Sequence, residues 1–252
     1  GSYSSSDQTS VILTLTGVTS NNTSLTISPN YDDATGTIID NAGNEMSFSE
    51  FVSGTDGAAP AILATSTLDG DKDGQIDQIL VTLSEAITDG SPTLLNNTTF
   101  TVAGYTVSGT ATGSSSANDN QVLISLAESG SGDTDATPDV VLVTAKISDG
   151  TNALASDQTF TGTTDGAAPA IFAANTLDDD KDGQIDQILV TLSETITDGS
   201  STLDNTTFTV AGYTVSGTST GSANDNQVLI SLTESGSGDT DATPDVVLVT
   251  AK

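Results

Sequence analysis

The chain carries one run of sequence twice, first as Lys72-Asp-Gly-Gln-Ile-Asp-Gln-Ile-Leu-Val-Thr-Leu-Ser-Glu85 and again, without change, as Lys181 to Glu194. The second half of the run alternates apolar and polar residues, which puts Ile79, Val81 and Leu83 on one face. A period of two is typical of a half-buried antiparallel β-strand. The run therefore predicts a repeated unit in which an acidic loop leads directly into a strand.

The repeat extends beyond this run in both directions. Thr55-Asp-Gly-Ala-Ala-Pro60 recurs as Thr164-Asp-Gly-Ala-Ala-Pro169, and Ile39-Asp-Asn-Ala-Gly-Asn-Glu-Met46, followed by Phe48 and Gly54, is a diverged version of the segment from Ile147 to Thr163. Self-similarity at a fixed period indicates an array of structural units. We expect residues 1–54 to be the C-terminal part of a preceding repeat or donated strands, 55–163 a complete repeat, and 164–252 a second repeat that lacks its final strand segment.

Short alternating runs continue along each repeat and are separated by turns rich in Gly, Ser and Asp. About seven short strands in ~110 residues are typical of an immunoglobulin-like sandwich. We therefore predict an all-β chain of tandem immunoglobulin-like antiparallel β-sandwiches, with almost no helix. Besides the strand already described, the expected inward-facing residues of the first repeat are Phe100, Val102, Val122, Ile124, Leu126, Val141, Val143 and Ala145.

The composition excludes several classes of function. The chain has 34 acidic residues against four basic ones, all lysine, and it has no histidine, cysteine or tryptophan. Without imidazole, thiolate or guanidinium groups, most catalytic chemistry is missing, so we expect no enzyme. The net charge of −30 repels nucleic acid. No apolar run approaches the ~20 residues of a membrane span, so we also expect no membrane insertion.

The acidic loop has the spacing of a calcium-binding loop. Carboxylates stand at loop positions 1, 3, 5 and 9 and a glycine at position 6, which permits the sharp turn needed to curl a chain around one hard cation. A strand pattern follows, so the loop is not an EF-hand, and magnesium would demand a tighter octahedron. The predicted calcium ligands of the first repeat are Asp69, Asp71, Asp73, the carbonyl of Gln75, and Asp77, which binds directly or through water. Those of the second repeat are Asp178, Asp180, Asp182, Gln184 and Asp186.

Other acidic residues are weaker candidates for the same chemistry. Glu85 and Glu194 could add a further ligand to each loop, and a second acidic cluster also occurs in both repeats. The alternative for the loop is a solvated acidic turn without an ion, and for the cluster a proline-containing turn before a strand. The residues of this cluster are Asp133, Asp135 and Asp139 in the first repeat, and Asp239, Asp241 and Asp245 in the second.

Three short motifs carry a resemblance to a known family. They are the Asp-Gly-Ala-Ala-Pro opening, the strand from Ile79 to Glu85 with its Ser-Glu corner, and the closing segments from Ile39 to Met46 and from Ile147 to Leu154. The repeat resembles the bacterial immunoglobulin-like repeats of large cell-surface and adhesin proteins, of the swimming-associated surface-protein type. The acidic loop is similar to calcium loops of adhesin and thrombospondin-type repeats. The resemblance implies a β-sandwich, extracellular display and no enzymatic activity.

These observations lead to one main functional hypothesis and two alternatives. We expect a calcium-stabilised structural region of a secreted or surface-anchored bacterial protein, which acts as an extender or stalk and has neighbouring repeats as its partners. The first alternative is a self-assembling filament or surface-layer subunit, in which residues 1–54 donate strands to an identical chain. The second is an adhesive module that binds a glycan or another cell, with Tyr105 and Tyr213 as the nearest candidates.

Overall fold

The computed structural model describes residues 42–44, 55–87, 95–113, 118–197, 203–220, 222, 224–234 and 236–249. Every named element in these residues is a β-strand, and every pairing between named strands is antiparallel. The all-β prediction is therefore confirmed for the described part of the chain. That part holds no helix long and apolar enough to cross a membrane. The expected end of a preceding repeat, residues 1–54, lies outside the described residues except for 42–44.

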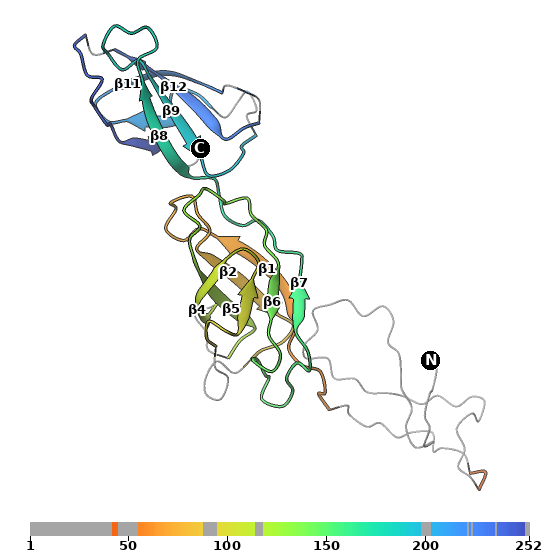
Figure 1. Cartoon of the computed structure of the whole chain (residues 1–252). Helices are drawn as coiled ribbons and strands as arrows, with labels where there is room; N and C mark the ends of the chain where they lie inside the picture. The colour runs from red at the N-terminus through yellow and green to blue at the C-terminus, as the bar shows by residue number, and fades with distance from the viewer. Residues whose placement is uncertain are drawn as a thin grey trace.

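The first unit is built from two sheets that face each other in a sandwich-like arrangement (Figure 1). One sheet has the order β1-β2-β5-β4, and the other has the order β3-β6-β7. Their facing sides enclose a core in which Phe100, Ile124 and Leu142 are almost fully buried. The strands are β1 (Ile62–Leu68), β2 (Gln78–Leu83), β3 (Phe100–Val102), β4 (Thr106–Thr112), β5 (Gln121–Ala127), β6 (Val140–Leu142) and β7 (Gln158–Phe160).

The second unit repeats this arrangement with one strand fewer among the described residues. Its four-stranded sheet has the order β11-β12-β9-β8, and its other sheet contains only β10 and β13. A separate core cluster forms around Phe208, Ile188 and Ile230. The strands are β8 (Ile171–Leu177), β9 (Gln187–Leu192), β10 (Phe208–Val210), β11 (Thr214–Ser219), β12 (Gln227–Thr233) and β13 (Val246–Leu248).

The alternating sequence pattern predicts burial correctly in most strands. Every second residue of β2 is buried, and the inward-facing residues of β3 and β5 are the expected ones. In β6 the expected face was wrong, because the structure buries Val140 and Leu142 and leaves Val141 only half-buried. The reason is that β6 lies in an unbroken apolar run, Val140-Val-Leu-Val143, which has no period that could distinguish the two faces.

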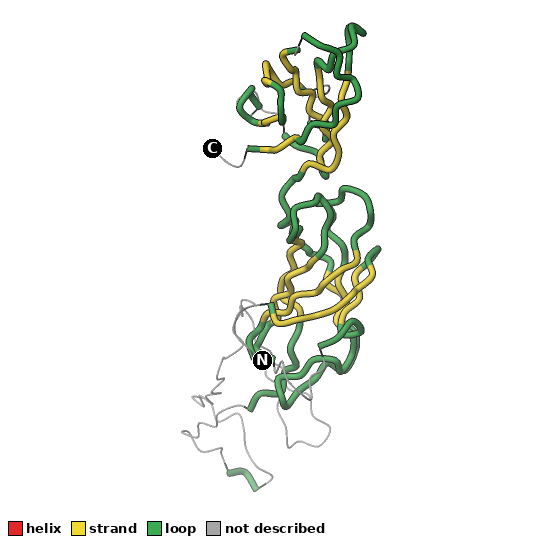
Figure 2. Tube along the Cα trace, turned by 90° about the vertical axis from the view of Figure 1, so that its left-hand side faces the viewer, coloured by secondary structure: helices red, strands yellow, loops and turns green. Residues whose placement is uncertain are grey.

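The two units follow each other along one elongated axis (Figure 1, Figure 2). The link between them is itself paired with the first unit, since Thr67 donates its N–H to the carbonyl of Thr164 at 3.0 Å and Thr164 donates to Thr65 at 2.9 Å. Thr65 also donates its hydroxyl to the Thr163 hydroxyl at 2.7 Å. The residues between β7 and β8 are therefore a hydrogen-bonded connection.

Candidate metal centre

The first acidic loop joins β1 to β2 and is held in shape by its own backbone. Asp69 accepts the N–H groups of Lys72 at 2.7 Å and of Gly74 at 2.9 Å, and Asp77 accepts the N–H of Gly70 at 2.8 Å. Two residues adopt positive φ, Lys72 at 66° and Gly74 at 91°. The glycine at position 6 therefore allows the sharp turn, as its place in the loop predicts.

Three of the predicted ligands in each loop converge. One carboxylate oxygen from each of Asp69, Asp71 and Asp73 lies within 4.8 Å of the other two, and the same holds for Asp178, Asp180 and Asp182. All six are at least partly exposed, so their carboxylates can meet an ion from solvent. Clustered hard oxygen ligands are what Ca²⁺ binds in proteins, and like charges so close together repel one another unless a cation lies between them.

The remaining predicted ligands are arranged less uniformly. Asp186 shares a second group with Asp180 and Glu234, again with oxygens within 4.8 Å of one another. The side chain of Gln75 spans the loop, with its Nε2 donating to Asp73 at 2.9 Å and its Oε1 accepting the N–H of Gly130. Gln184 makes the same pair of contacts in the second loop, with Asp182 and Gly236. The glutamine side chains therefore brace the loops.

Sequence reasoning missed one acidic residue beside each loop. Glu128 directly follows β5. The negative charges of the first loop raise its pKa, and repulsion from Asp73 is the largest cause. Repulsion from Asp182 raises the pKa of Glu234 in the same way. The backbone explains this placement, because Leu126 at the end of β5 donates its N–H to Asp77 at 2.8 Å. Only the strand pairing shows that these glutamates lie beside the loops.

The aspartates of the second acidic cluster do not join the converging carboxylates of the loop; one of them in each unit bonds to the loop backbone instead. Asp133 accepts the N–H of Ile76 on one oxygen at 2.8 Å, and the hydroxyls of Tyr105 at 2.8 Å and Ser129 at 2.9 Å on the other. Asp133 therefore links the loop at Ile76 to Tyr105 and Ser129. Asp239 makes the matching bonds to Ile185 and Tyr213. Among the described residues, the metal-capable groups include none of Asp133, Asp135, Asp139, Asp239, Asp241 and Asp245.

Glu85 lies in a separate, fourth group, away from the loop. It follows the opposite end of β2 and comes together with Asp56 and Asp149, with one oxygen of each within 4.8 Å of the others. Burial, followed by the charges of Asp149 and Asp56, raises the pKa of Glu85. Its counterpart Glu194 accepts the Thr134 hydroxyl at 3.0 Å, and burial is the largest cause of its raised pKa. Both glutamates therefore lie at unit ends.

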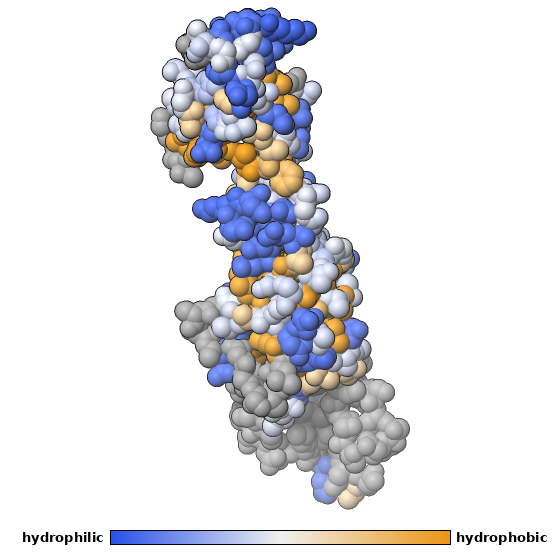
Figure 3. Space-filling model, turned by 60° about the vertical axis from the view of Figure 1, so that its left-hand side comes forward, coloured by the Kyte–Doolittle hydropathy of each residue, from blue (hydrophilic) through white to orange (hydrophobic). Residues whose placement is uncertain are grey.

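The first loop lies against the second unit. A Cβ on Gly74 would come within 2.9 Å of the Ser193 side chain, and a Cβ on Gly132 within 2.7 Å of the Ser193 backbone. Thr134 is completely buried there, with its hydroxyl oxygen 2.7 Å from that of Ser193. Hydrophilic surface of the first unit borders apolar surface of the second at this waist (Figure 3). The first acidic loop is therefore part of a close-packed junction, whereas the second lies at the far end of the molecule.

Comparison with known proteins gives no match to a family model, a curated protein or a solved structure.

Proposed function

We propose that this chain is a calcium-stabilised array of immunoglobulin-like units that acts as an extender or stalk in a bacterial extracellular or cell-surface protein. The observation that carries the proposal is the repeated acidic loop, whose three leading aspartates converge in both units and whose first copy lies at the junction between them. Calcium bound at that loop stiffens the array, and neighbouring repeats are its natural partners.

The strand order supports the immunoglobulin-like assignment. In an immunoglobulin constant-type sandwich, strands A, B, E and D form one sheet and C, F and G the other. The first unit has β1-β2-β5-β4 facing β3-β6-β7, which is the same order when its strands are lettered along the chain. The second unit has the same order without the last strand among its described residues.

The charge balance supports calcium as the cofactor. The chain has a net charge of −30 and only four basic residues, so protein cations cannot neutralise the clustered aspartates. Lys72 and Lys181 stand inside the two loops, but their backbones, in the left-handed region, form part of the turn. A divalent cation bound by oxygen ligands removes the repulsion directly.

The tyrosines lend little support to an adhesive role. Tyr105 packs against the core of the first unit and donates its hydroxyl to Asp133, and burial together with this bond raises its pKa. Tyr213 likewise donates its hydroxyl to the carboxylate of Asp239. A ring fixed in this way supports the acidic loop, so we assign the tyrosines a structural role and propose no glycan site.

The two loops provide a matched test of the stalk role. Asp71→Asn weakens calcium at the junction and Asp180→Asn weakens it at the far end, with the same chemical change. We expect small-angle scattering with calcium to show a wider spread of molecular lengths for Asp71→Asn and an unchanged spread for Asp180→Asn. Equal spreads for both variants and the parent chain would contradict a stiffening role for the junction loop.

A further inference from the structure

The segment that leaves the first unit runs beside β1 in the same direction. Ser66 on β1 and Thr164 form a parallel bridge. Thr164 donates its N–H to the carbonyl of Thr65 at 2.9 Å, and its own carbonyl accepts the N–H of Thr67 at 3.0 Å. The named strands of this unit pair antiparallel, so this parallel contact differs from the pairing within its two sheets.

Side chains extend this contact toward both ends of β1. At the start of β1, the side-chain amide of Gln158 accepts the N–H of Ile62 at 2.6 Å and donates to its carbonyl at 3.1 Å. Near the other end of β1, Gly166 donates its N–H to the Thr67 hydroxyl at 3.1 Å. The bonded residues therefore advance together along the two segments, as they do in a parallel pair of strands.

The contact is shielded from water. Thr65 is 2% exposed and Thr67 is fully buried. The Thr65 hydroxyl donates to that of Thr163 at 2.7 Å, and Thr163 in turn donates to the carbonyl of Pro138 at 2.6 Å. The backbones also approach closely, since a Cβ on Gly166 would lie 2.7 Å from the carbonyl oxygen of Thr67. Buried hydrogen bonds are costly to leave unmade, so the two segments resist separation.

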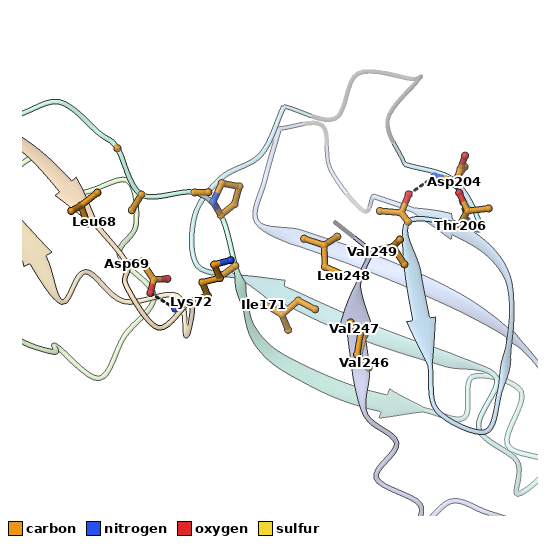
Figure 4. Close-up of a pocket in the computed structure, with 16 residues that line it drawn as sticks. Leu68, Asp69, Lys72, Ile171, Asp204, Thr206, Val246, Val247, Leu248 and Val249 are labelled. Carbon is orange, nitrogen blue, oxygen red and sulfur yellow. Dashed lines mark hydrogen bonds between the residues drawn. The ribbon is translucent and has the colours of Figure 1, made fainter. Parts of the chain in front are cut away.

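The two segments leave the unit at opposite ends. Residues 55–61 enter β1 at the end of the unit that lies away from β8 (Figure 1). Beyond the contact, the other segment passes Leu68 and Lys72 and enters β8 at Ile171 (Figure 4). Tension along the array therefore pulls β1 by its N-terminal end and the other segment by its C-terminal end. Because the segments are parallel, this tension acts in shear and loads all the bonds between them at once.

We propose that the bonds between β1 and residues 158–166 form a mechanical clamp, which transmits tension through the first unit and leaves the rest of the sandwich unloaded. The inference deepens the stalk role, on which it rests for the direction of the load. No aspartate of the acidic loop takes part in these bonds, so the clamp bears force with or without calcium. Bonds that are loaded together must break together, whereas bonds that are loaded in sequence break one by one at lower force.

Force spectroscopy with two handle positions tests the clamp. The chain has no cysteine of its own, so handles can be attached at introduced cysteines in the full chain. Thr55→Cys with Ala168→Cys applies shear, and Thr55→Cys with Ser156→Cys peels the segments apart from the end at Gln158. The three handle positions are exposed, and both pairs flank only the first unit. We expect the unfolding force in shear to be at least about twice the force in peeling. Equal forces in the two geometries would overturn the proposal.

One hydroxyl tests whether the bonds share the load. Thr67→Val removes the acceptor of Gly166, which lies at the end that peels last. This variant should lower the shear force and leave the peeling force nearly unchanged. Thr101→Val, the same change at an exposed position of β3, is the control and should alter neither force. A Thr67→Val chain in which neither force falls, or both fall equally, would contradict the clamp.

The clamp and the calcium-stiffened stalk can fail separately. If the shear force exceeds the peeling force but Asp71→Asn and the parent chain show equal spreads of length in scattering, the clamp stands and calcium stiffening is refuted. If the two forces are equal but the spreads differ as expected, the clamp is refuted and the stiffened junction stands.

Discussion

At the scale of single residues, small side chains decide how closely the two units approach. Gly132 lies against the backbone of Ser193, and Thr134 next to it is buried in the same contact. The equivalent glycine of the second unit, Gly238, has only the carbonyl of Gly183 near the position of a Cβ, at 3.3 Å. Glycine is therefore required by close packing at position 132, at the junction between the units, whereas position 238 leaves room for a larger side chain.

This contrast predicts the effect of adding one methyl group. Gly132→Ala should separate the units and cost about 1–3 kcal/mol of the contact, because a Cβ there meets backbone atoms that cannot rotate away. Gly238→Ala should have little effect. Calorimetric unfolding measures the stability, and small-angle scattering measures the inter-unit spread. Similar curves for both variants would show that the units do not pack as described.

The raised pKa values of Glu85 and Glu194 predict how stability depends on pH in the metal-stripped chain. A carboxyl with a raised pKa in the folded state stabilises the fold below its unfolded value, near 4.5, and this contribution is lost as pH rises through the folded pKa. The melting temperature should therefore rise as pH falls from 7 to 5. Glu85→Gln should reduce that rise. A melting temperature that falls over this range in the parent chain would contradict the prediction.

The residues of the site show what sequence can and cannot predict. Spacing along the chain is sufficient to find Asp69, Asp71 and Asp73, because all three stand in one short loop. It cannot place Glu128, because this residue reaches the loop only through the pairing of β5 with β2. The predicted strand between the loop and Glu85, in contrast, is enough to separate them, because an extended strand holds its two ends apart. Ligands within one loop can be predicted from the sequence, whereas acidic residues that a neighbouring strand brings to the loop can be found only once the strand pairing is known.

At the scale of elements, β7 is a short strand that connects several parts of the first unit. It pairs with β6, and the side chain of Gln158 bonds the backbone at the start of β1 in the opposite sheet. It also leads directly into the connection that pairs with Thr67. The alternating runs predict β2, β3 and β5 with their correct faces, but a three-residue strand with no clear period, such as β7, can be located only through its partners.

The double contact of Gln158 predicts a measurable contribution to stability. Gln158→Leu should destabilise the first unit by about 1–3 kcal/mol, because it leaves the N–H of Ile62, which is 5% exposed, without its acceptor. Thr159→Ala on the exposed face of the same strand is the control and should cost far less. Urea unfolding of both variants measures the difference. Equal losses would show that the contact to β1 does not stabilise the sandwich.

At the scale of the whole molecule, strong acidity and repetition belong together. Eight aspartates stand at positions 1, 3, 5 and 9 of the same loop in the two units, and the chain has only four basic residues to balance them. The first loop lies at the contact between the units, and the second lies at the opposite end of the second unit (Figure 1). In this account, bound calcium neutralises the clustered carboxylates, as Lys and Arg side chains do on other protein surfaces. It also stiffens each junction of an extended array.

Calorimetric titration of the metal-stripped chain with calcium tests this account most directly. We predict binding at both loops, with a rise in melting temperature, and loss of one site in each of Asp71→Asn and Asp180→Asn. In the double variant the heat from both loops should disappear. The account would be contradicted if calcium produced neither heat nor a rise in melting temperature in the parent chain, or if the double variant bound calcium as the parent does.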